Sequence, residues 1–205
     1  MAKLDVDRHL REQMSAADPW NLDRNPFEAK RYAVMRDLLE PFAPFGDALE
    51  VGCAAGAFTV HLAALSRRVH LVDRMPEALD RAAARVGSVA GLTWEVADVG
   101  AGQLAPRRFD AIVAAEVLYF LPGREELERA IETLVERLAP GGVFLLGSAR
   151  DEVVARWGMW GGAETTMDVL ERHLTRASLV HVTGADAGED SYAVLYRHRA
   201  PELRD

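Results

Sequence analysis

The sequence predicts an α/β protein with a mostly parallel seven-stranded sheet, helices on both faces and a reversed last strand. An apolar run at 48–52 ends in a glycine-bracketed turn, and apolar residues at helical spacing follow it. Short apolar strands then alternate with amphipathic helices as far as residue 147. Near the end, the alternating segments 176–182 and 192–198 are joined by a short glycine-containing connection, which makes them antiparallel.

Size and charge narrow the possible classes of protein. The chain has 205 residues and a formal net charge of −8. We expect one domain over 1–205, with 1–26 as an N-terminal arm or lid and 27–198 as the α/β core. The acidic charge argues against a nucleic-acid partner, which usually needs a basic face. A single cysteine, no secretory signal and no membrane-length apolar run predict a cytoplasmic protein without a membrane anchor or an obligate protein partner.

The N-terminal region has an uncertain structure before a clear helix. Residues 1–17 suggest a weak helix or an arm, and a proline-containing break follows at 18–20. From Phe27 onward, apolar residues at helical spacing predict a helix. Trp20 has two interpretations: it packs the arm onto the sheet, or it belongs to a lid over a cofactor, with Arg31 of the following helix reaching a carboxylate.

The turn after the first strand, E-V-G-C-A-A-G at 50–56, indicates the kind of cofactor. Gly52 and Gly56 can adopt backbone angles closed to other residues and let a ligand approach the main chain. A dinucleotide fingerprint also needs glycine at positions 54 and 57, which are both alanine here. Glu50 is costly to bury without a partner, so we interpret it as a site residue. The alternative is a glycine-rich connector that binds nothing.

The next two strands end in acidic residues at the same sheet edge. The strand at 68–73 ends in Asp73, about 20 residues after the turn, where a carboxylate can accept hydrogen bonds from a ribose. Alternatively, Asp73 caps the helix that follows. The strand at 92–97 precedes Asp98 and Val99. There Asp98 can accept from an adenine amine while Val99 packs against the ring, or Asp98 makes an Asx turn.

The fourth strand carries the candidate catalytic residues. The run at 109–116 is almost continuously apolar, as expected for a central parallel strand buried on both faces. It ends in Glu116, and Tyr119 lies just beyond. We predict that Glu116 attracts a cationic acceptor and accepts its proton; alternatively, it bonds to nearby backbone amides. The histidines lack metal-ligand spacing, so no metal is expected.

The remaining elements complete the sheet. A helix at 122–138 and a tight turn at 139–142 lead into a fifth strand at 143–147. The segment after it, at 148–165, is rich in glycine, tryptophan and charge, and a helix follows at 167–173. The final hairpin carries the weaker site candidates, since acidic hairpin tips are usually only solvated; they are Asp186, Glu189 and Asp190.

These motifs resemble a known family. E-V-G-C-A-A-G is similar to motif I of the class I S-adenosylmethionine-dependent methyltransferases, which are Rossmann-like domains with a reversed last strand. Other stretches resemble nodulation protein S, the rhizobial N-methyltransferase that acts on the deacetylated amino sugar of a chitooligosaccharide. They are D-P-W-N-L-D-R-N-P-F-E (18–28), A-E-V-L-Y-F-L (115–121), L-A-P-G-G (138–142), G-S-A-R-D (147–151), R-W-G (156–158) and G-A-E-T (162–165).

The resemblance implies an enzyme that uses S-adenosylmethionine, releases S-adenosylhomocysteine and needs no metal. The implied acceptor is the free amine of a deacetylated glucosamine unit; the alternative is another small-molecule amine or hydroxyl. A cofactor-binding protein without catalysis and a nicotinamide dehydrogenase are the other classes considered. The implied cofactor residues are Trp20, Arg31, Glu50, Gly52, Cys53, Gly56, Asp73, Arg74, Met75, Asp98, Val99 and Ala115, with Trp20 and Arg31 over the methionine end. The implied acceptor residues are Arg150, Asp151, Trp157 and Glu164, beside the catalytic candidates Glu116 and Tyr119.

Overall fold

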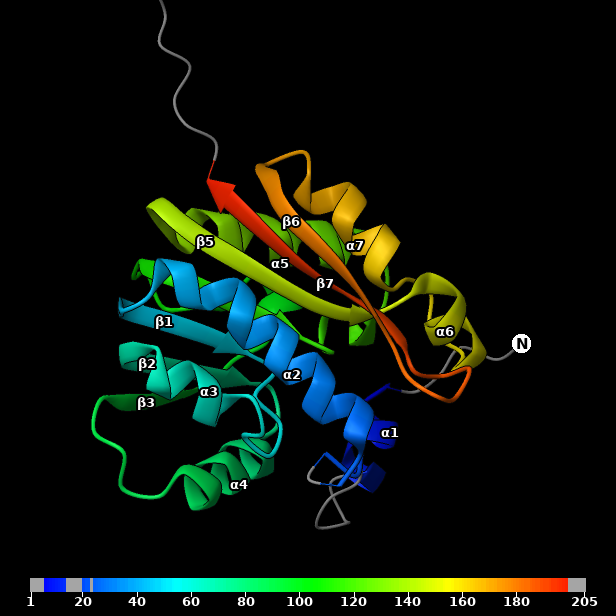
Figure 1. Ribbon diagram of the computed structural model, residues 1–205, viewed down its shortest axis with the longest axis horizontal. Helices are drawn as coiled ribbons and strands as arrows, with labels where there is room; N and C mark the ends of the chain where they lie inside the picture. Colours follow the sequence, from blue (N-terminus) through cyan, green and yellow to red (C-terminus); the bar gives the residue numbers. More distant parts are fainter. Residues whose placement is uncertain (1–5, 14–19, 23, 199–205) are drawn as a thin grey trace, which may run out of the picture.

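The structure is a computed structural model that describes residues 6–13, 20–22 and 24–198 (Figure 1). The other residues, 1–5, 14–19, 23 and 199–205, lie outside the described part of the chain. The predicted break at 18–19 and much of the predicted arm fall among them.

One seven-stranded sheet organises the described residues, in the order β3-β2-β1-β4-β5-β7-β6. Strand β7 is antiparallel to both its neighbours, β5 and β6, and the other adjacent pairs are parallel. The predicted sheet with a reversed last strand is therefore confirmed. The strands are β1 (Phe45–Val51), β2 (Ser66–Asp73), β3 (Leu92–Val96), β4 (Phe109–Ala115), β5 (Leu138–Ala149), β6 (Leu174–Thr183) and β7 (Asp190–His198).

Helices cover both faces of this sheet (Figure 1). One apolar cluster joins α2, α3 and α4 to one face, and a second joins α5 and α7 to the other. The helices are α1 (Val6–Gln13), α2 (Pro26–Leu39), α3 (Thr59–Ala64), α4 (Pro76–Val86), α5 (Arg124–Arg137), α6 (Asp151–Arg156) and α7 (Ala163–Leu170). Short 3-10 turns lie at Glu40–Phe42, Val99–Ala101 and Leu118–Phe120.

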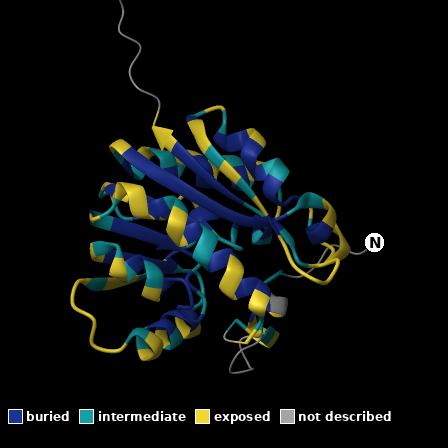
Figure 2. Ribbon diagram, viewed as in Figure 1, coloured by how far each residue is buried: buried dark blue, intermediate teal, exposed yellow. Residues whose placement is uncertain are grey.

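Burial follows the predicted layers. Residues 111–114 of β4 are completely buried, as expected for the central strand of a sheet covered on both faces. Figure 2 shows the inner strands in the buried colour and the outer sides of the helices in the exposed colour. No helix in the described part of the chain is long and apolar enough to cross a membrane.

Two local expectations were wrong. The predicted tight turn at 139–142 lies inside β5, because Leu138 pairs with Phe109 and Val143 pairs with Ala111. The four residues between them bulge out, with Gly141 at φ +79°, and pairing with β4 resumes on the other side. The segment after β5 also forms a helix, α6, that the sequence pattern did not predict.

Candidate active site

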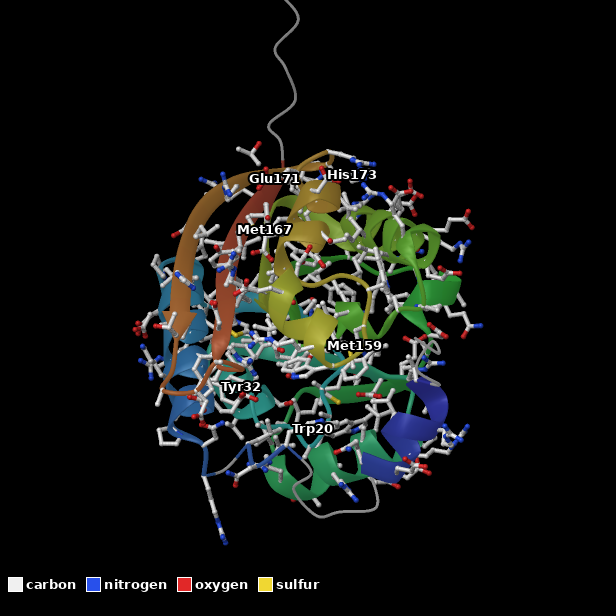
Figure 3. The ribbon with its side chains drawn as sticks, turned by 90° about the vertical axis from the view of Figure 1, so that its right-hand side faces the viewer. Trp20, Tyr32, Met159, Met167, Glu171 and His173 are labelled. Carbon is white, nitrogen blue, oxygen red and sulfur yellow. The ribbon has the colours of Figure 1, made fainter. Side chains whose placement is uncertain are left out.

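A cavity of about 610 Å³ opens at the carboxyl edge of the parallel strands. Its size is within the usual range for small-molecule sites. Turns after β1, β2 and β4 line it, together with α1, the start of α2 and the tip of the β6–β7 hairpin. In Figure 3, Trp20, Tyr32 and Met159 lie on this side of the molecule, and all three line the cavity. A ligand edge at the ends of the strands is the expected position in an open α/β sheet.

The cavity brings most of the predicted site residues together. Both catalytic candidates, Glu116 and Tyr119, line it, and so does one acceptor candidate, Trp157. The predicted cofactor residues that line it are Trp20, Arg31, Glu50, Gly52, Cys53, Asp73, Arg74, Met75, Asp98, Val99 and Ala115. Gly56, Arg150, Asp151 and Glu164 are not among the lining residues.

The turn after β1 needs glycine at positions 52 and 56 for two different physical reasons. Gly52 has φ +70°, and a Cβ there would collide with the Val117 side chain. Gly56 has φ +73°, and a Cβ there would lie 2.9 Å from the Cα of Ala82 in α4. Both positions are strained for residues with a side chain. Gly56 therefore lets the turn pack on α4, while Gly52 shapes the cavity wall itself.

Asp73 joins the first turn to the start of α4. Its Oδ2 accepts a hydrogen bond from the Ala54 amide at 3.2 Å, and its Oδ1 accepts one from the Met75 amide at 2.9 Å. These bonds are local, but Asp73 is not the helix cap: Met75 is the N-cap of α4 and receives no capping bond from a side chain. The Asp73 carboxylate lines the cavity, and its ribose role stays a prediction. Burial raises the pKa of Asp73, and the hydrogen bonds from the backbone lower it.

Two other acidic residues line the same half of the cavity. Glu50 is 2% exposed, its Oε2 accepts a hydrogen bond from Thr59 Oγ1 at 2.7 Å, and burial raises its pKa to about 8. Asp98 Oδ1 accepts from the Gly100 amide at 2.9 Å, which confirms the Asx turn, and its Oδ2 lies 3.6 Å from Arg74 Nη2. The adenine role of Asp98 stays a prediction.

A buried charge network occupies the opposite wall. Arg31 is 4% exposed and forms ion pairs with two carboxylates, Glu28 from its own helix and Glu116 from the end of β4. Arg31 Nη1 lies 2.8 Å from Glu116 Oε1 in an ion pair. Tyr119 Oη donates to Glu116 Oε2 at 2.9 Å. Two polar atoms, Arg31 Nε and Glu116 Oε1, are buried without a hydrogen-bond partner among the described residues.

Local structure explains why these side chains point at one another. Asn25 caps α2 by accepting from the Phe27 amide at 2.9 Å, and Pro26 begins the helix. Residues at i and i+3 share one helix face, which places Glu28 beside Arg31. At the other end of the network, Glu116 has φ +51°, a conformation that non-glycine residues rarely adopt.

Some cavity residues were missed by the sequence interpretation. Glu28 is not among the predicted site residues, although an acidic residue three positions before an arginine signals a pair. Tyr32 is also absent from the predicted site residues, but its ring centroid lies 5.6 Å from the Arg31 guanidinium and the residue lines the cavity. Leu10 and Met159 reach the cavity only through tertiary packing, for which no local pattern exists.

The predicted acceptor segment contains a second polar cluster, here called the clasp: Arg150, Asp151, Glu164 and Thr165. Arg150 Nε donates to Glu164 Oε1 at 2.6 Å, and the Asp151 amide donates to Glu164 Oε2 at 2.7 Å. Asp151 accepts from the Gly162 amide, the Thr165 amide and the Thr165 hydroxyl. These bonds close the loop between α6 and α7, and the acceptor roles of the clasp residues stay predictions.

Trp157 ends α6 and lines the cavity. It is 44% exposed, and its ring packs edge-on against Tyr119 with 5.8 Å between the centroids. Of the weaker hairpin candidates, Glu189 lines the cavity. Asp190 instead contacts His181 Nε2 at 2.5 Å and Arg150 Nη1 at 3.5 Å.

Solved structures with this architecture identify the class. The chain superposes with a TM-score of 0.91 on the crystal structure of N-methyltransferase NodS from Bradyrhizobium japonicum in complex with S-adenosylhomocysteine. The two are 38% identical, over 97% of this chain and 100% of that one. Together with the sheet order and the glycine turn at its carboxyl edge, this makes the protein a class I S-adenosylmethionine-dependent methyltransferase.

The sequence comparisons identify the family. The family model of nodulation protein S matches residues 2–201. Nodulation protein S of Rhizobium tropici is 43% identical over 92% of this chain and 79% of its own length. Nodulation protein S of Bradyrhizobium diazoefficiens is 40% identical over 91% of this chain and 89% of its own length. The chain belongs to the nodulation protein S family.

The cavity fits the chemistry of S-adenosylmethionine. Ribose hydroxyls and an ammonium group need acceptors, and carboxylates of the kind required line the cavity after β1, β2 and β3, Asp73 among them. A carboxylate needs donors, and the buried Nε of Arg31 has an N–H without a partner among the described residues. Gly52 has no side chain, so a ligand can approach its backbone closely. Val99 offers an apolar surface against which a ring can pack.

Proposed function

We propose that this methyltransferase transfers a methyl group to the free amine of a deacetylated glucosamine unit of a chitooligosaccharide. The observation that carries the proposal is Glu116, a carboxylate on the cavity wall whose Oε2 accepts from Tyr119 and whose Oε1 lies 2.8 Å from Arg31 Nη1 in an ion pair. A carboxylate in this position can attract an acceptor ammonium and accept its proton. The name N-methyltransferase of the Bradyrhizobium relative supports the same chemistry.

The cofactor residues have distinct proposed roles. The Gly52 turn and Asp73 would hold the ribose side, Asp98 and Val99 the adenine, and Arg31 the methionine carboxylate. When bound, S-adenosylmethionine supplies an electrophilic methyl group. We also propose that the whole chain works as one domain in the cytoplasm, with residues 1–26 as an arm over the core.

Positioning contributes more than base strength to the proposed reaction. An amine that titrates near ~7.7–8.0 is deprotonated at neutral pH at a cost of only about 1 kcal/mol. Alignment of two reacting groups can contribute roughly 7–11 kcal/mol. Glu116 therefore needs only to attract the ammonium and hold its proton, while Tyr119 fixes the carboxylate through its hydrogen bond. The exposed Trp157 ring, packed on Tyr119, offers an apolar surface for a pyranose ring.

Calorimetry tests the proposal directly. S-adenosylhomocysteine is titrated into the protein, and the saturated protein is then titrated with a chitooligosaccharide that carries a free terminal amine. A fully acetylated chain of the same length is the matched control. Binding of the first sugar but not the second is the expected result. Cofactor binding with equal affinity for both sugars would remove the amine acceptor from the proposal.

A second candidate is methyl transfer to another small-molecule amine or hydroxyl. The clasp favours it, because Arg150, Asp151 and Glu164 are the predicted sugar-binding residues. They bond to one another and do not line the cavity. Cofactor binding without any sugar binding would select this alternative.

A further inference from the structure

Glu28 is a buried carboxylate for which the proposed reaction has no role yet. It is 9% exposed, lies in the first turn of α2 and lines the cavity. Burial raises the pKa of Glu28, and the neighbouring Arg31 lowers it. Burying a carboxylate is costly unless a partner compensates its charge, and for Glu28 that partner is Arg31.

The charges on the cavity wall are unequal. Among the described lining residues the cations are Arg31 and Arg74, and Arg74 lies beside Asp98 at 3.6 Å. The acidic lining residues are Glu28, Asp73, Asp98, Glu116 and Glu189, together with Glu50, whose raised pKa of about 8 leaves it mostly neutral at pH 7. Arg31 is therefore the cation that two carboxylates, Glu28 and Glu116, share.

This sharing decides what Glu116 can attract. The methionine end of the bound cofactor carries one carboxylate and one ammonium and so adds no net charge. With Arg31 alone, Glu116 would therefore form a pair without net charge, and an ammonium approaching it would gain little. Glu28 occupies the other terminal nitrogen of the same guanidinium, so the three groups together keep one excess negative charge when both carboxylates are ionised. Tyr32 and Glu189 also face Glu28, and neither adds a positive charge.

We propose that Glu28 is a specificity-determining residue that makes the site prefer an acceptor with an ammonium group over a neutral acceptor of the same shape. It acts through Arg31, as a positioning residue, and it supplies the excess charge that Arg31 and Glu116 lack as a pair. The inference rests on the proposed amine acceptor and names the residue that selects it.

The test compares Glu28→Gln with the wild type after saturation with S-adenosylhomocysteine. The probes are the deacetylated and the fully acetylated chitooligosaccharide, titrated at pH 6.5 and at pH 9. At pH 6.5 an amine with a pKa near ~7.7–8.0 is mostly protonated. There we expect the variant to bind the deacetylated sugar at least about tenfold more weakly, equivalent to ~1.4 kcal/mol. At pH 9 the difference should shrink, and S-adenosylhomocysteine should bind both proteins within about threefold.

Two further variants separate charge from structure. Glu28→Asp keeps the charge, and we expect it to retain the preference for the deacetylated sugar. Glu132→Gln removes an exposed carboxylate from α5, away from the cavity lining, and should behave like the wild type. A purely structural role would weaken cofactor binding and act equally at both pH values.

The outcomes distinguish the two proposals. A wild type without any preference for the free amine overturns the proposed acceptor, and the role of Glu28 falls with it. A wild type with the preference and a Glu28→Gln variant with the same preference overturn the role of Glu28 alone. If Glu28→Gln does not fold, a Glu28→Asp variant that binds S-adenosylhomocysteine normally but has lost the preference contradicts the inference.

Discussion

The cavity network and the clasp are built from the same residue types but differ in what they leave unsatisfied. In the network, Arg31 pairs with Glu28 and Glu116, and two buried polar atoms have no hydrogen-bond partner among the described residues. In the clasp, the carboxylates of Asp151 and Glu164 accept bonds from backbone amides and side chains of their own loop. Unsatisfied buried groups indicate a place for a ligand, whereas satisfied ones close a loop.

The largest expected effect comes from the network. Glu116→Gln keeps the hydrogen bond with Tyr119 possible but removes the charge and the proton acceptor. We expect turnover to fall roughly 10²–10⁴-fold, because the variant loses the charge that aligns the acceptor as well as the proton acceptor, with S-adenosylhomocysteine affinity little changed. Single-turnover kinetics and calorimetry measure the two quantities. Near-normal turnover would remove Glu116 from the reaction.

The second prediction concerns pH and the buried Glu50. Its pKa is raised from 4.5 to about 8 in the folded protein. The folded state therefore holds this proton more tightly than the unfolded chain does, and the stability it gives is present below pH 4.5 and is lost as pH rises through 8. Glu50→Gln should remove this loss, on the order of a few kcal/mol. Urea unfolding of both proteins between pH 5 and pH 9 measures it; parallel curves would contradict the buried neutral form.

The clasp should respond in stability rather than in catalysis. Asp151→Ala removes the acceptor for the Gly162 and Thr165 amides at the start of α7. We expect about 1–2 kcal/mol less stability, the usual cost of a lost helix cap. Turnover per folded molecule should stay within about threefold of the wild type. Denaturant unfolding and steady-state kinetics provide the comparison, and a large loss of acceptor affinity would instead support the acceptor role of this residue.

The smallest effect is expected at an exposed cluster. Arg172 of the α7 C-terminal turn contacts Glu128 at 3.0 Å and Asp168 at 2.9 Å, and its side chain is 51% exposed. Solvent and salt screen such pairs, so Arg172→Gln should change Tm by less than about 2 °C. Thermal unfolding at two salt concentrations checks this. A larger change in Tm would show that burial does not determine how much a charge cluster contributes to the stability of this protein.

The sequence predicted most helices and strands, because the spacing of apolar residues that defines each one lies within a single short segment. The apolar strands and the glycine turn each depend on residues within one segment, and so does the position of Asp73. Local patterns failed where a distant partner decided the outcome. Leu138 and Val143 pair with β4 on both sides of a turn-forming sequence, so the turn became a bulge within one strand.

The sequence by itself determined the fold class, the cofactor edge and the family, since all three follow from the order of strands, helices and the motifs between them. Only the tertiary structure decided which charged residues face the cavity. Glu28 and Glu116 meet at Arg31 because α2 packs on one face of the sheet and its first turns reach the cavity, where β4 ends. The clasp residues bond to one another and close their own loop. Residue type indicates that a charge needs a partner, and packing decides whether that partner is the protein or a ligand.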